Sequence, residues 1–390
     1  MTGPRGDTAP PKAARATLRG RPSLYTDYAA DQAIWNTPAK RYWTVALILA
    51  VIATPFLPFV TRSQQADLTL VFVLAIGGIG LNLLTGYAGQ VSLGHAFFVG
   101  VGAFTASVLG GMPTQNVVGF ELDLLIWLPA AGLVSMVLGL LVAPLAARVR
   151  GLYLAILTLG LVFIGEHLFK ELRSISGGQG VGRRGPDPEI LGFALFHPQE
   201  IFGLQLDRET PWYLFTFLLL VVMAILGRNL ARSRMGRAFA AVRDRDIAAE
   251  IMGVPLLRTK VLAFGVSSFY AGVAGALLAV SFGQVTPENF GGLGGLLLSV
   301  EFLAIILIGG VATMSGSIIG ATFVVLMPRL VQAFAPQIPL IGDGALLSVQ
   351  QLEGILFGVL IVLFLILEPR GLFGLWLRIR NYWKAWPFSY

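Results

Sequence analysis

The chain of 390 residues contains no cysteine, only three histidines and few charged residues, which make up 13% of its length. The absence of cysteine excludes structural disulfides and thiolate metal sites. His95, His167 and His197 lie in separate segments, so the sequence predicts no metal site. A soluble chain normally carries about a quarter charged residues. The low charge and the 55% of hydrophobic residues together favour a membrane protein.

Sequence patterns for nucleotide binding and hydrolysis are also missing. No G-x-x-x-x-G-K-[ST] pattern occurs and no lysine follows a glycine, so the chain has no P-loop. The H-E-x-x-H and G-x-S-x-G patterns are absent as well. The glycine-rich run "SGGQGVGRRG" at 176–185 has no strand before it and no helix start after it, which favours a loop, a turn or a docking surface over a phosphate site. We therefore expect no enzyme, no bound cofactor and no nucleic-acid partner.

Apolar runs of roughly 17 to 25 residues recur along the chain, which is the length that an α-helix needs to cross a bilayer. The runs do not alternate as barrel strands do. We therefore expect an all-α, polytopic helical membrane protein. Glycines in the third and eighth runs leave open whether those spans are continuous, broken or re-entrant. The ten predicted spans are 43–60, 68–85, 91–110, 124–146, 151–169, 211–227, 259–281, 295–313, 316–335 and 350–368.

Basic residues orient the predicted bundle. Seven Lys or Arg residues precede Trp43, eight lie between 228 and 260, and others follow residue 369, which the positive-inside rule makes cytoplasmic. The predicted organisation is a disordered or amphipathic cytoplasmic arm (1–42), a transmembrane domain (43–375) and a cytoplasmic tail (376–390). Within the domain we expect an extracytoplasmic loop at 171–210 and a cytoplasmic loop at 228–258.

The cytoplasmic loop predicts one short helix over residues 237–252. The helix has a small apolar face formed by Ala240, Ala241, Ile247, Ala248 and Ile251. A glycine at 253 and a proline at 255 end it. The charged flank is typical of a solvated surface, and the alternative is that the apolar face docks in a groove on a partner.

Several motifs then occur in a fixed order over about residues 68–375. They are "GYAGQVSLGHAFFVGVGAF" from residue 86, "RGLYLAILTLG" from 150, an "AA-x-x-x-G" pattern at Ala248, Ala249 and Gly253, "SVEFLAIILIGGVATMSGSIIGA" from 299 and "EPRGLFG" from 368. Together they resemble the branched-chain (hydrophobic) amino acid ABC transporter permease family, and the RGLY and PRGL segments are similar to the second of its two permease types. The outer loop shares the glycines of the family's TGG-x-x-G run and departs from it elsewhere.

The resemblance implies a multi-pass permease subunit of an ATP-driven importer in the plasma or inner membrane. The subunit would form half of the pathway for branched-chain or related amino acids. The implied partners are two ATP-binding subunits, which would use the ATP, a homologous second permease and an extracytoplasmic substrate-binding protein. The residues that the resemblance implies for contact with the ATPase are Arg237, Ala241, Arg243, Ala248, Ala249, Glu250 and Gly253.

Polar groups inside the spans give candidate pathway residues. We expect Gln90, Ser92, Gly94, His95 and Glu301 to face the translocation route, because polar groups and bare backbone are costly in lipid. The alternative is that Gln90, Ser92 and His95 cap the start of a helix or form hydrogen bonds between helices. Glu301, an intramembrane acid, also fits hydrogen bonding to neighbouring helices or a role in ion coupling.

Other functions remain open at this point. A self-contained secondary carrier or channel for a small polar solute would need no ATPase. The same ABC architecture could instead move urea or short amides. An integral-membrane enzyme is a further alternative.

Overall fold

The computed structural model describes residues 38–58, 60–114, 117–149, 151–196, 199–201, 204–206, 209–334, 349–368 and 370–385. The chain divides into two compact units, Met1–Leu57 and Pro58–Tyr390. The first unit contains helix α2 (Pro38–Ala53) and a 3-10 turn, η1 (Thr54–Phe56). Residues 1–37 of the predicted N-terminal arm lie outside the described residues.

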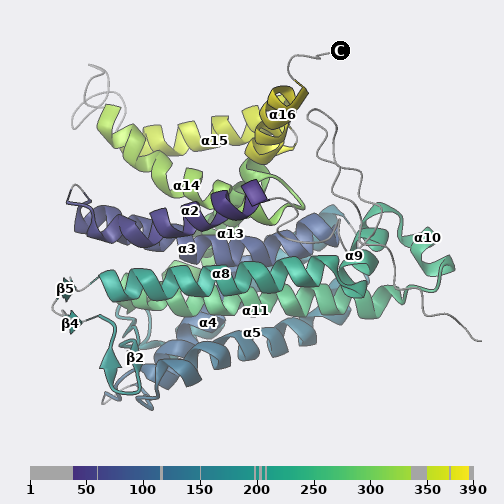
Figure 1. Ribbon diagram of the computed structural model, residues 1–390. Coiled ribbons are helices and arrows are strands. Elements are labelled where there is room, and N and C mark those ends of the chain that lie inside the picture. The colour runs from purple at the N-terminus through teal and green to yellow at the C-terminus, as the bar shows by residue number, and fades with distance from the viewer. Residues whose placement is uncertain are drawn as a thin grey trace, which may run out of the picture. The chain divides into compact units, whose positions relative to one another are not determined.

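The second unit is built from helices joined by short connections (Figure 1). Its long helices are α3 (Arg62–Leu81), α4 (His95–Gly110), α5 (Leu124–Ala146), α6 (Leu152–Glu171), α8 (Thr210–Arg232), α11 (Leu256–Phe282), α13 (Gly292–Gly309), α14 (Met314–Phe334), α15 (Val349–Leu367) and α16 (Gly371–Ala385). Its shorter elements are η2 (Asn82–Tyr87), which is a π-helical turn, α7 (Arg173–Ser176), α9 (Arg234–Asp244), α10 (Asp246–Ile251) and α12 (Pro287–Phe290).

Among the described residues, seven helices are long and apolar enough to cross a membrane. They are Arg62–Tyr87, Leu124–Ala146, Leu152–Glu171, Thr210–Arg232, Leu256–Phe282, Gly292–Gly309 and Met314–Gln332. The three remaining predicted spans match shorter apolar helices, which are Arg41–Phe56, His95–Gly110 and Gly354–Phe364. The prediction of an all-α, polytopic membrane protein is therefore confirmed.

The two predicted spans with many glycines differ from each other. The third was expected from residue 91, but α4 begins at His95 and its 16 residues extend for only about 24 Å. That length is less than the roughly 30 Å of a hydrocarbon core. The eighth span is the continuous helix α13, which follows the short α12. Only the third span is therefore interrupted, at its start.

The predicted outer loop contains short antiparallel strand pairs. Strand β1 (Arg183–Arg184) pairs with β6 (Gln284–Val285), which follows the end of α11. The other pairs are β2 (Glu189–Ile190) with β3 (Phe193–Ala194), and β4 (Gln199–Ile201) with β5 (Leu204–Leu206). Helices α9 and α10 precede the other end of α11. The two predicted loops therefore lie at opposite ends of one spanning helix, whereas their assignment to membrane sides stays a prediction.

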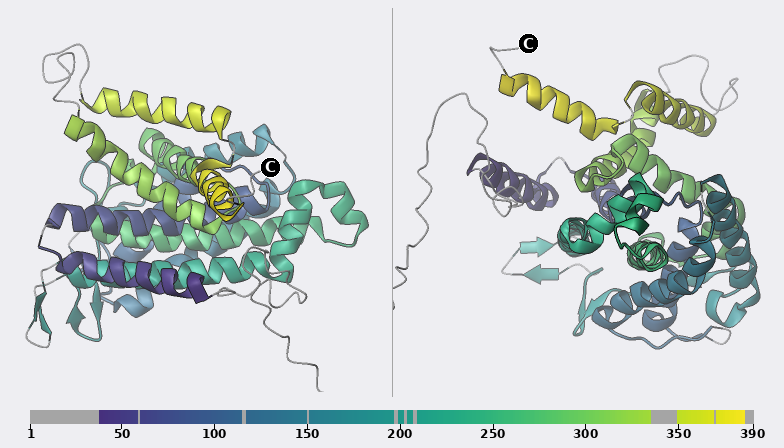
Figure 2. Two further views of the ribbon diagram at one scale, coloured as in Figure 1. Left: turned by 45° about the horizontal axis from the view of Figure 1, so that its top comes forward. Right: turned by 90° about the vertical axis from the view of Figure 1, so that its right-hand side faces the viewer.

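Helix α11 is the centre of the second unit. It packs against α3, α4 and α5, and most of its residues are buried (Figures 1 and 2). Glycines make this close packing feasible: a methyl group at Gly102 of α4 would lie only 2.5 Å from the Cα of Gly272. In a membrane, such close backbone approach supplies van der Waals contact where water provides no hydrophobic driving force.

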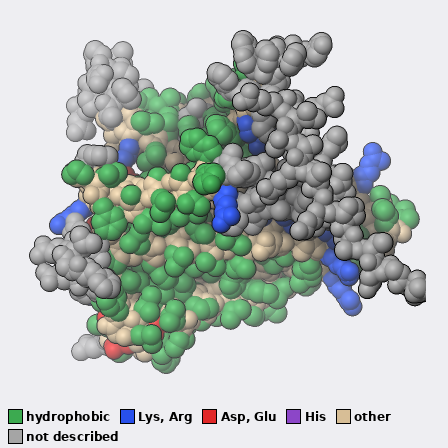
Figure 3. All heavy atoms as spheres, in the orientation of Figure 1, with side chains coloured by type: hydrophobic (Ala, Val, Ile, Leu, Met, Phe, Trp, Pro, Cys, Tyr) green, Lys and Arg blue, Asp and Glu red, His purple; other side chains and the backbone are tan. Residues whose placement is uncertain are grey.

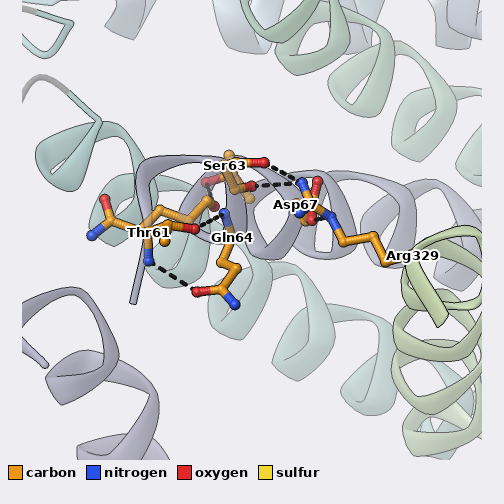
Figure 4. Close-up of polar contacts among 7 residues, drawn as sticks. Thr61, Ser63, Gln64, Asp67 and Arg329 are labelled. Atoms are coloured by element: carbon orange, nitrogen blue, oxygen red, sulfur yellow. Dashed lines mark hydrogen bonds and ion pairs between the residues drawn. The ribbon is translucent and has the colours of Figure 1, made fainter. Parts of the chain in front are cut away.

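The first turn of α3 is joined to α14 by polar groups (Figure 4). The Thr61 hydroxyl accepts from the Gln64 N–H at 3.3 Å, and the Thr61 N–H donates to the Gln64 side chain at 2.9 Å. This capping box satisfies backbone groups that a helix start leaves free. Arg329 of α14 forms an ion pair with Asp67 and donates to Ser63. These contacts hold the two helix ends together.

We predict that Gly102→Val weakens the α4–α11 contact. The added side chain would overlap the Gly272 backbone, so the free energy of unfolding should fall by about 1–3 kcal/mol. The midpoint of thermal unfolding in detergent measures the change. Gly160→Val is the matched control, because no atom lies within 4 Å of a methyl group placed there. Equal midpoints for the two variants would contradict the proposed packing role.

A second prediction concerns the membrane sides. The natural absence of cysteine allows single cysteines to be introduced at Val181 and Leu257, which are 65% and 55% exposed. In intact cells an impermeant maleimide should label Val181→Cys, and it should label Leu257→Cys only after permeabilisation. Labelling of Leu257→Cys in intact cells would reverse the predicted orientation.

Candidate functional site

The helical bundle contains a stretch of irregular backbone between α3 and α4. Helix α3 continues into the π-helical turn η2, and residues 88–94 are not helical before α4 begins at His95. Gly89 takes a φ of +69°, a left-handed conformation that L side chains rarely adopt. We call residues 86–95 the polar segment.

Side chains from distant helices satisfy the backbone of the polar segment. The Thr158 hydroxyl of α6 accepts from the Leu93 N–H at 3.0 Å. The Ser299 hydroxyl of α13 accepts from the Ala96 N–H at 3.1 Å. Within the segment, the Ser92 hydroxyl accepts from the Gly94 N–H at 3.3 Å. The start of α4 is thus held by α6 and α13.

His95 is buried and joins α4 to α3. Its Nε2 lies 3.1 Å from the Gly77 carbonyl oxygen, and its ring meets Phe302 edge-on with centroids 4.8 Å apart. Because a carbonyl oxygen only accepts, Nε2 carries the proton in this contact. His95 and Ser92 are 2% and 1% exposed. In this arrangement both face the chain's own interior, and their role in the pathway stays a prediction.

Gln90 is also buried, but it borders an open space. Its side chain donates to the Lys260 carbonyl at 3.4 Å. It lines a cavity of about 290 Å³. The remaining lining residues are Ala88, Gly89, Val149, Gly151, Leu154, Val242, Arg243, Asp244, Arg245, Asp246 and Lys260. The cavity therefore lies between the polar segment and the predicted coupling region.

Arg243 connects those two regions directly. Its Nη1 donates to the Gly86 carbonyl at 2.9 Å, and its guanidinium also pairs with Asp244 at 3.0 Å. A methyl group at Gly89 would lie 2.7 Å from the Arg243 Cγ. The side chain thus lies against the bare backbone of the polar segment.

The coupling region is two helices, so the prediction of one helix over residues 237–252 is wrong. Helix α9 ends at Asp244, and Arg245 is extended with φ −157° and ψ 102° before α10 begins at Asp246. The Asp246 carboxylate accepts from the Ile247 N–H at 2.9 Å. An aspartate near a helix start favours a new helix over continuation of the old one.

The apolar surface of α10 differs from the expected one. Ile247 and Ile251 are 66% and 82% exposed, and Met252 after the helix is 84% exposed. Ala248 and Glu250 are exposed beside them, whereas Ala249 is buried in the chain and is not part of this surface. Gly253 ends the region with a φ of +85°.

The residues of α9 that were predicted to contact the ATPase differ from one another in exposure. Arg237 is exposed and donates to the Arg232 carbonyl at 3.2 Å, while Ala241 is half-buried. Figure 3 shows Lys and Arg side chains at the end of the molecule where α9 and α10 lie. The exposed surface of this region thus combines apolar side chains of α10 with charged side chains, among them the basic Arg237 and the acidic Asp244 and Glu250.

Glu301 does not join the polar segment. Ser299 and Phe302 of α13 contact α4, whereas Glu301 lines a cavity of about 770 Å³ bordered by α12, α13, α14 and α15. The structure therefore groups Gln90, Ser92, Gly94 and His95 and leaves Glu301 at a second site.

Asn82 is a polar residue that the sequence interpretation missed. Its side chain donates to the Thr313 carbonyl at 2.8 Å and to the Ser317 hydroxyl at 2.9 Å, and accepts from the Ala312 N–H at 2.8 Å. Asn82 thereby holds the turn between α13 and α14 against η2. An asparagine inside an apolar run was the available signal.

Arg183 of the glycine-rich outer loop was missed in the same way. It is buried, and it donates to the Ile175 carbonyl at 2.8 Å and to the Ser107 carbonyl near the end of α4. Burial lowers its pKa to about 10, so it stays charged at neutral pH. The loop is therefore fixed to α4 by Arg183 and to β6 by strand pairing. Among the described residues, no group of three or more His, Cys, Asp or Glu is placed to hold a metal ion.

Comparisons with known proteins identify the family to which the chain belongs. A family model described as "Branched-chain amino acid transport system / permease component" matches residues 66–365. The chain is 30% identical over 349 residues to the high-affinity branched-chain amino acid transport system permease protein LivM of Escherichia coli K12, covering 86% of this chain and 76% of LivM. LivM of Salmonella typhimurium matches to the same extent.

More distant relatives match shorter parts. LivH of E. coli K12, a permease protein of the same named system, is 26% identical over 42% of this chain and 46% of its own length. The L-arabinose transport system permease protein AraH of E. coli K12 is 26% identical over 53% of this chain and 60% of AraH. No solved structure matches the chain. The family match over most of the helical unit, and the identity to LivM, show that this multi-pass membrane protein belongs to the family of permease components of branched-chain amino acid transport systems.

Proposed function

We propose that this chain is the transmembrane subunit of an ATP-driven importer and forms half of the translocation pathway for branched-chain or related amino acids. Two ATP-binding subunits would bind and hydrolyse the ATP, since the chain has no P-loop. An extracytoplasmic binding protein would deliver the substrate.

A second, homologous permease subunit completes the proposed pathway. LivM and LivH of E. coli K12 carry the same system name, and both are similar to this chain. The similarity covers twice as much of this chain for LivM (86%) as for LivH (42%). The chain would accordingly occupy the position of LivM beside a LivH-like partner.

The observation that carries the proposal is the hydrogen bond from Arg243 to the Gly86 carbonyl. It joins the exposed helices α9 and α10 to the irregular backbone that precedes α4. A subunit docked on these helices would therefore act on the polar segment through a side chain already in contact with it. A carrier that works without an ATPase has no need of such a connection.

In this proposal the ATPase docks on the apolar end of α10, next to the basic side chains of α9. Ile247, Ile251 and Met252 expose apolar side chains outside the spanning helices, where water makes such exposure unfavourable. A groove on an ATPase would cover them in a helix-in-groove contact. The positive side chains of α9 favour an acidic rim around that groove.

We predict that Ile251→Glu weakens docking of the ATPase and thereby lowers ATP-driven uptake. A carboxylate cannot be solvated in an apolar groove, so ATP-driven uptake should fall by at least about tenfold at unchanged membrane level. Two measurements check the effect. One is uptake of radiolabelled leucine into vesicles, and the other is co-purification of the ATPase through a tag carried by this chain. Ile251→Leu, which keeps the apolar contact, should retain both. Normal uptake by Ile251→Glu would refute docking at α10.

A further prediction tests the connection itself. Arg243→Met removes the donor to Gly86 while keeping an unbranched side chain. Uptake per ATP hydrolysed should fall roughly tenfold, because a hydrogen bond from a charged donor is lost. ATPase co-purification should persist, since the α10 surface is intact. Arg184→Met is the control, because Arg184 is an exposed residue of β1 paired with Asp187. An unchanged coupling ratio in Arg243→Met would show that Arg243 does not transmit the signal.

A further inference from the structure

The cavity that contains Glu301 has apolar walls and acidic charge. Its volume of about 770 Å³ lies within the roughly 300–1,000 Å³ that is usual for ligand pockets. Both charged side chains among its described lining residues are acidic, Glu288 and Glu301. The remaining lining residues are Phe282, Asn289, Gly294, Leu297, Leu298, Val300, Val324, Pro328 and Gly354. We call this space the Glu301 cavity.

Glu301 lies at the middle of the spanning helix α13. It is the tenth of 18 residues, so about 12–14 Å of helix separates it from each end. Glu301 is half-buried, and it lines the cavity. No basic side chain in the described part of the chain forms an ion pair with it. An intramembrane acid of this kind marks a substrate or ion pathway.

A second acceptor follows from the sequence of α14. Pro328 has no N–H, so it cannot donate to the carbonyl of Val324 four residues earlier. Both residues line the Glu301 cavity. A backbone break of this type is tolerated in membranes where it borders a protein cavity. Helix α14 thus has a carbonyl without its helical donor at the wall opposite α13.

The outer end of the cavity is polar as well. Glu288 and Asn289 belong to α12, directly before α13. The Glu288 carboxylate accepts from the Gly180 N–H at 3.3 Å, which ties the cavity entrance to the glycine-rich outer loop. The cavity therefore extends from the region of that loop to the middle of α13.

We propose that the Glu301 cavity binds the α-ammonium group of a hydrophobic amino acid during translocation, with Glu301 as the acidic partner. An ammonium carries three donors and no acceptor, which matches a carboxylate and a backbone carbonyl that lacks its regular helical donor. The leucine and valine side chains of the wall suit an aliphatic substrate.

This proposal rests on the proposed function and makes it more specific. Sugars, urea and short amides carry no positive charge and would leave the half-buried Glu301 carboxylate without a counterion, which is costly. An amino acid neutralises it. The Glu301 cavity would therefore discriminate amino acids from neutral solutes of similar size.

The first experiment uses the absence of cysteine in the chain. A single Leu297→Cys places a thiol one helical turn from Glu301, on a residue that is 61% exposed. In the assembled transporter, purified through a tag on this chain, a cationic methanethiosulfonate should modify it at least about tenfold faster than an anionic one. Leucine should protect the thiol, and 4-methylpentanoate, which has the same carbon skeleton without the amine, should not.

The matched control is Ile156→Cys on α6, which is 57% exposed but outside the cavity. It should show neither the preference for the cationic reagent nor protection by leucine. Equal protection of Leu297→Cys by leucine and 4-methylpentanoate would overturn the proposal. Protection by neither compound, in a transporter that carries leucine, would overturn it as well.

The second experiment measures ATP-driven uptake by the Glu301→Gln transporter in proteoliposomes. The KM for leucine should rise at least about tenfold, since a charged hydrogen-bond partner is lost, while ATPase activity without substrate is retained. Glu189→Gln, in the exposed outer hairpin, should behave as wild type.

The outcomes separate this proposal from the proposed function. If the wild-type transporter carries leucine and Glu301→Gln leaves the KM for leucine unchanged, the proposed role of the Glu301 cavity is rejected. The proposed importer function then still stands. If protons move together with leucine in the wild-type transporter and this proton movement is lost in Glu301→Gln, Glu301 is assigned to ion coupling instead. A wild-type transporter that carries a neutral solute but no leucine rejects the amino-acid substrate itself. If Glu301→Gln fails to assemble, protection of Leu297→Cys still decides, because that variant keeps Glu301.

Discussion

The backbone groups that leave the helical pattern between α3 and α4 each require a partner, because a membrane protein's interior offers little water to replace one. This constraint accounts for the polar residues around the break. The Thr158 and Ser299 hydroxyls accept from two backbone N–H groups at the start of α4, and Ser92 accepts from a third. Since those partners come from α6 and α13, the break also determines how three helices are joined.

The same constraint extends the site towards helices α9 and α10. The Gly86 carbonyl at the end of η2 is bound by Arg243, whose side chain comes from α9. A carbonyl inside a regular helix would be occupied by its own helix and unable to accept this bond. Irregular backbone therefore has two consequences here. It requires polar partners, and it makes a carbonyl available to a side chain outside the bundle.

Features set by local sequence were predictable, whereas contacts between distant residues were not. The ten apolar runs correspond to helices because hydropathy reflects the solvent around each residue. The bonds of His95 to Gly77 and of Asn82 to Thr313 join segments whose proximity no local pattern reports. Burial of Ala249 was missed because helical periodicity was applied across Arg245, where the helix ends. Glu301 was predicted as a pathway residue because an acid in an apolar span is costly without a function, but the lining of its cavity required the fold.

Helix α13 connects the two polar sites of the molecule. Successive residues of a helix turn by about 100°, so Ser299 and Glu301 point about 160° apart. Ser299 accordingly binds α4 while Glu301 lines the cavity beside α14. Contacts therefore run from α9 through Arg243 to the polar segment, and from α4 through α13 to Glu301. Such a path transmits a change only where one of its elements has two arrangements. Residues 88–94 are the part of this path whose backbone is held by side chains of other helices, Thr158 among them, instead of by a continuous helical ladder, so a movement of those helices would act on this segment directly.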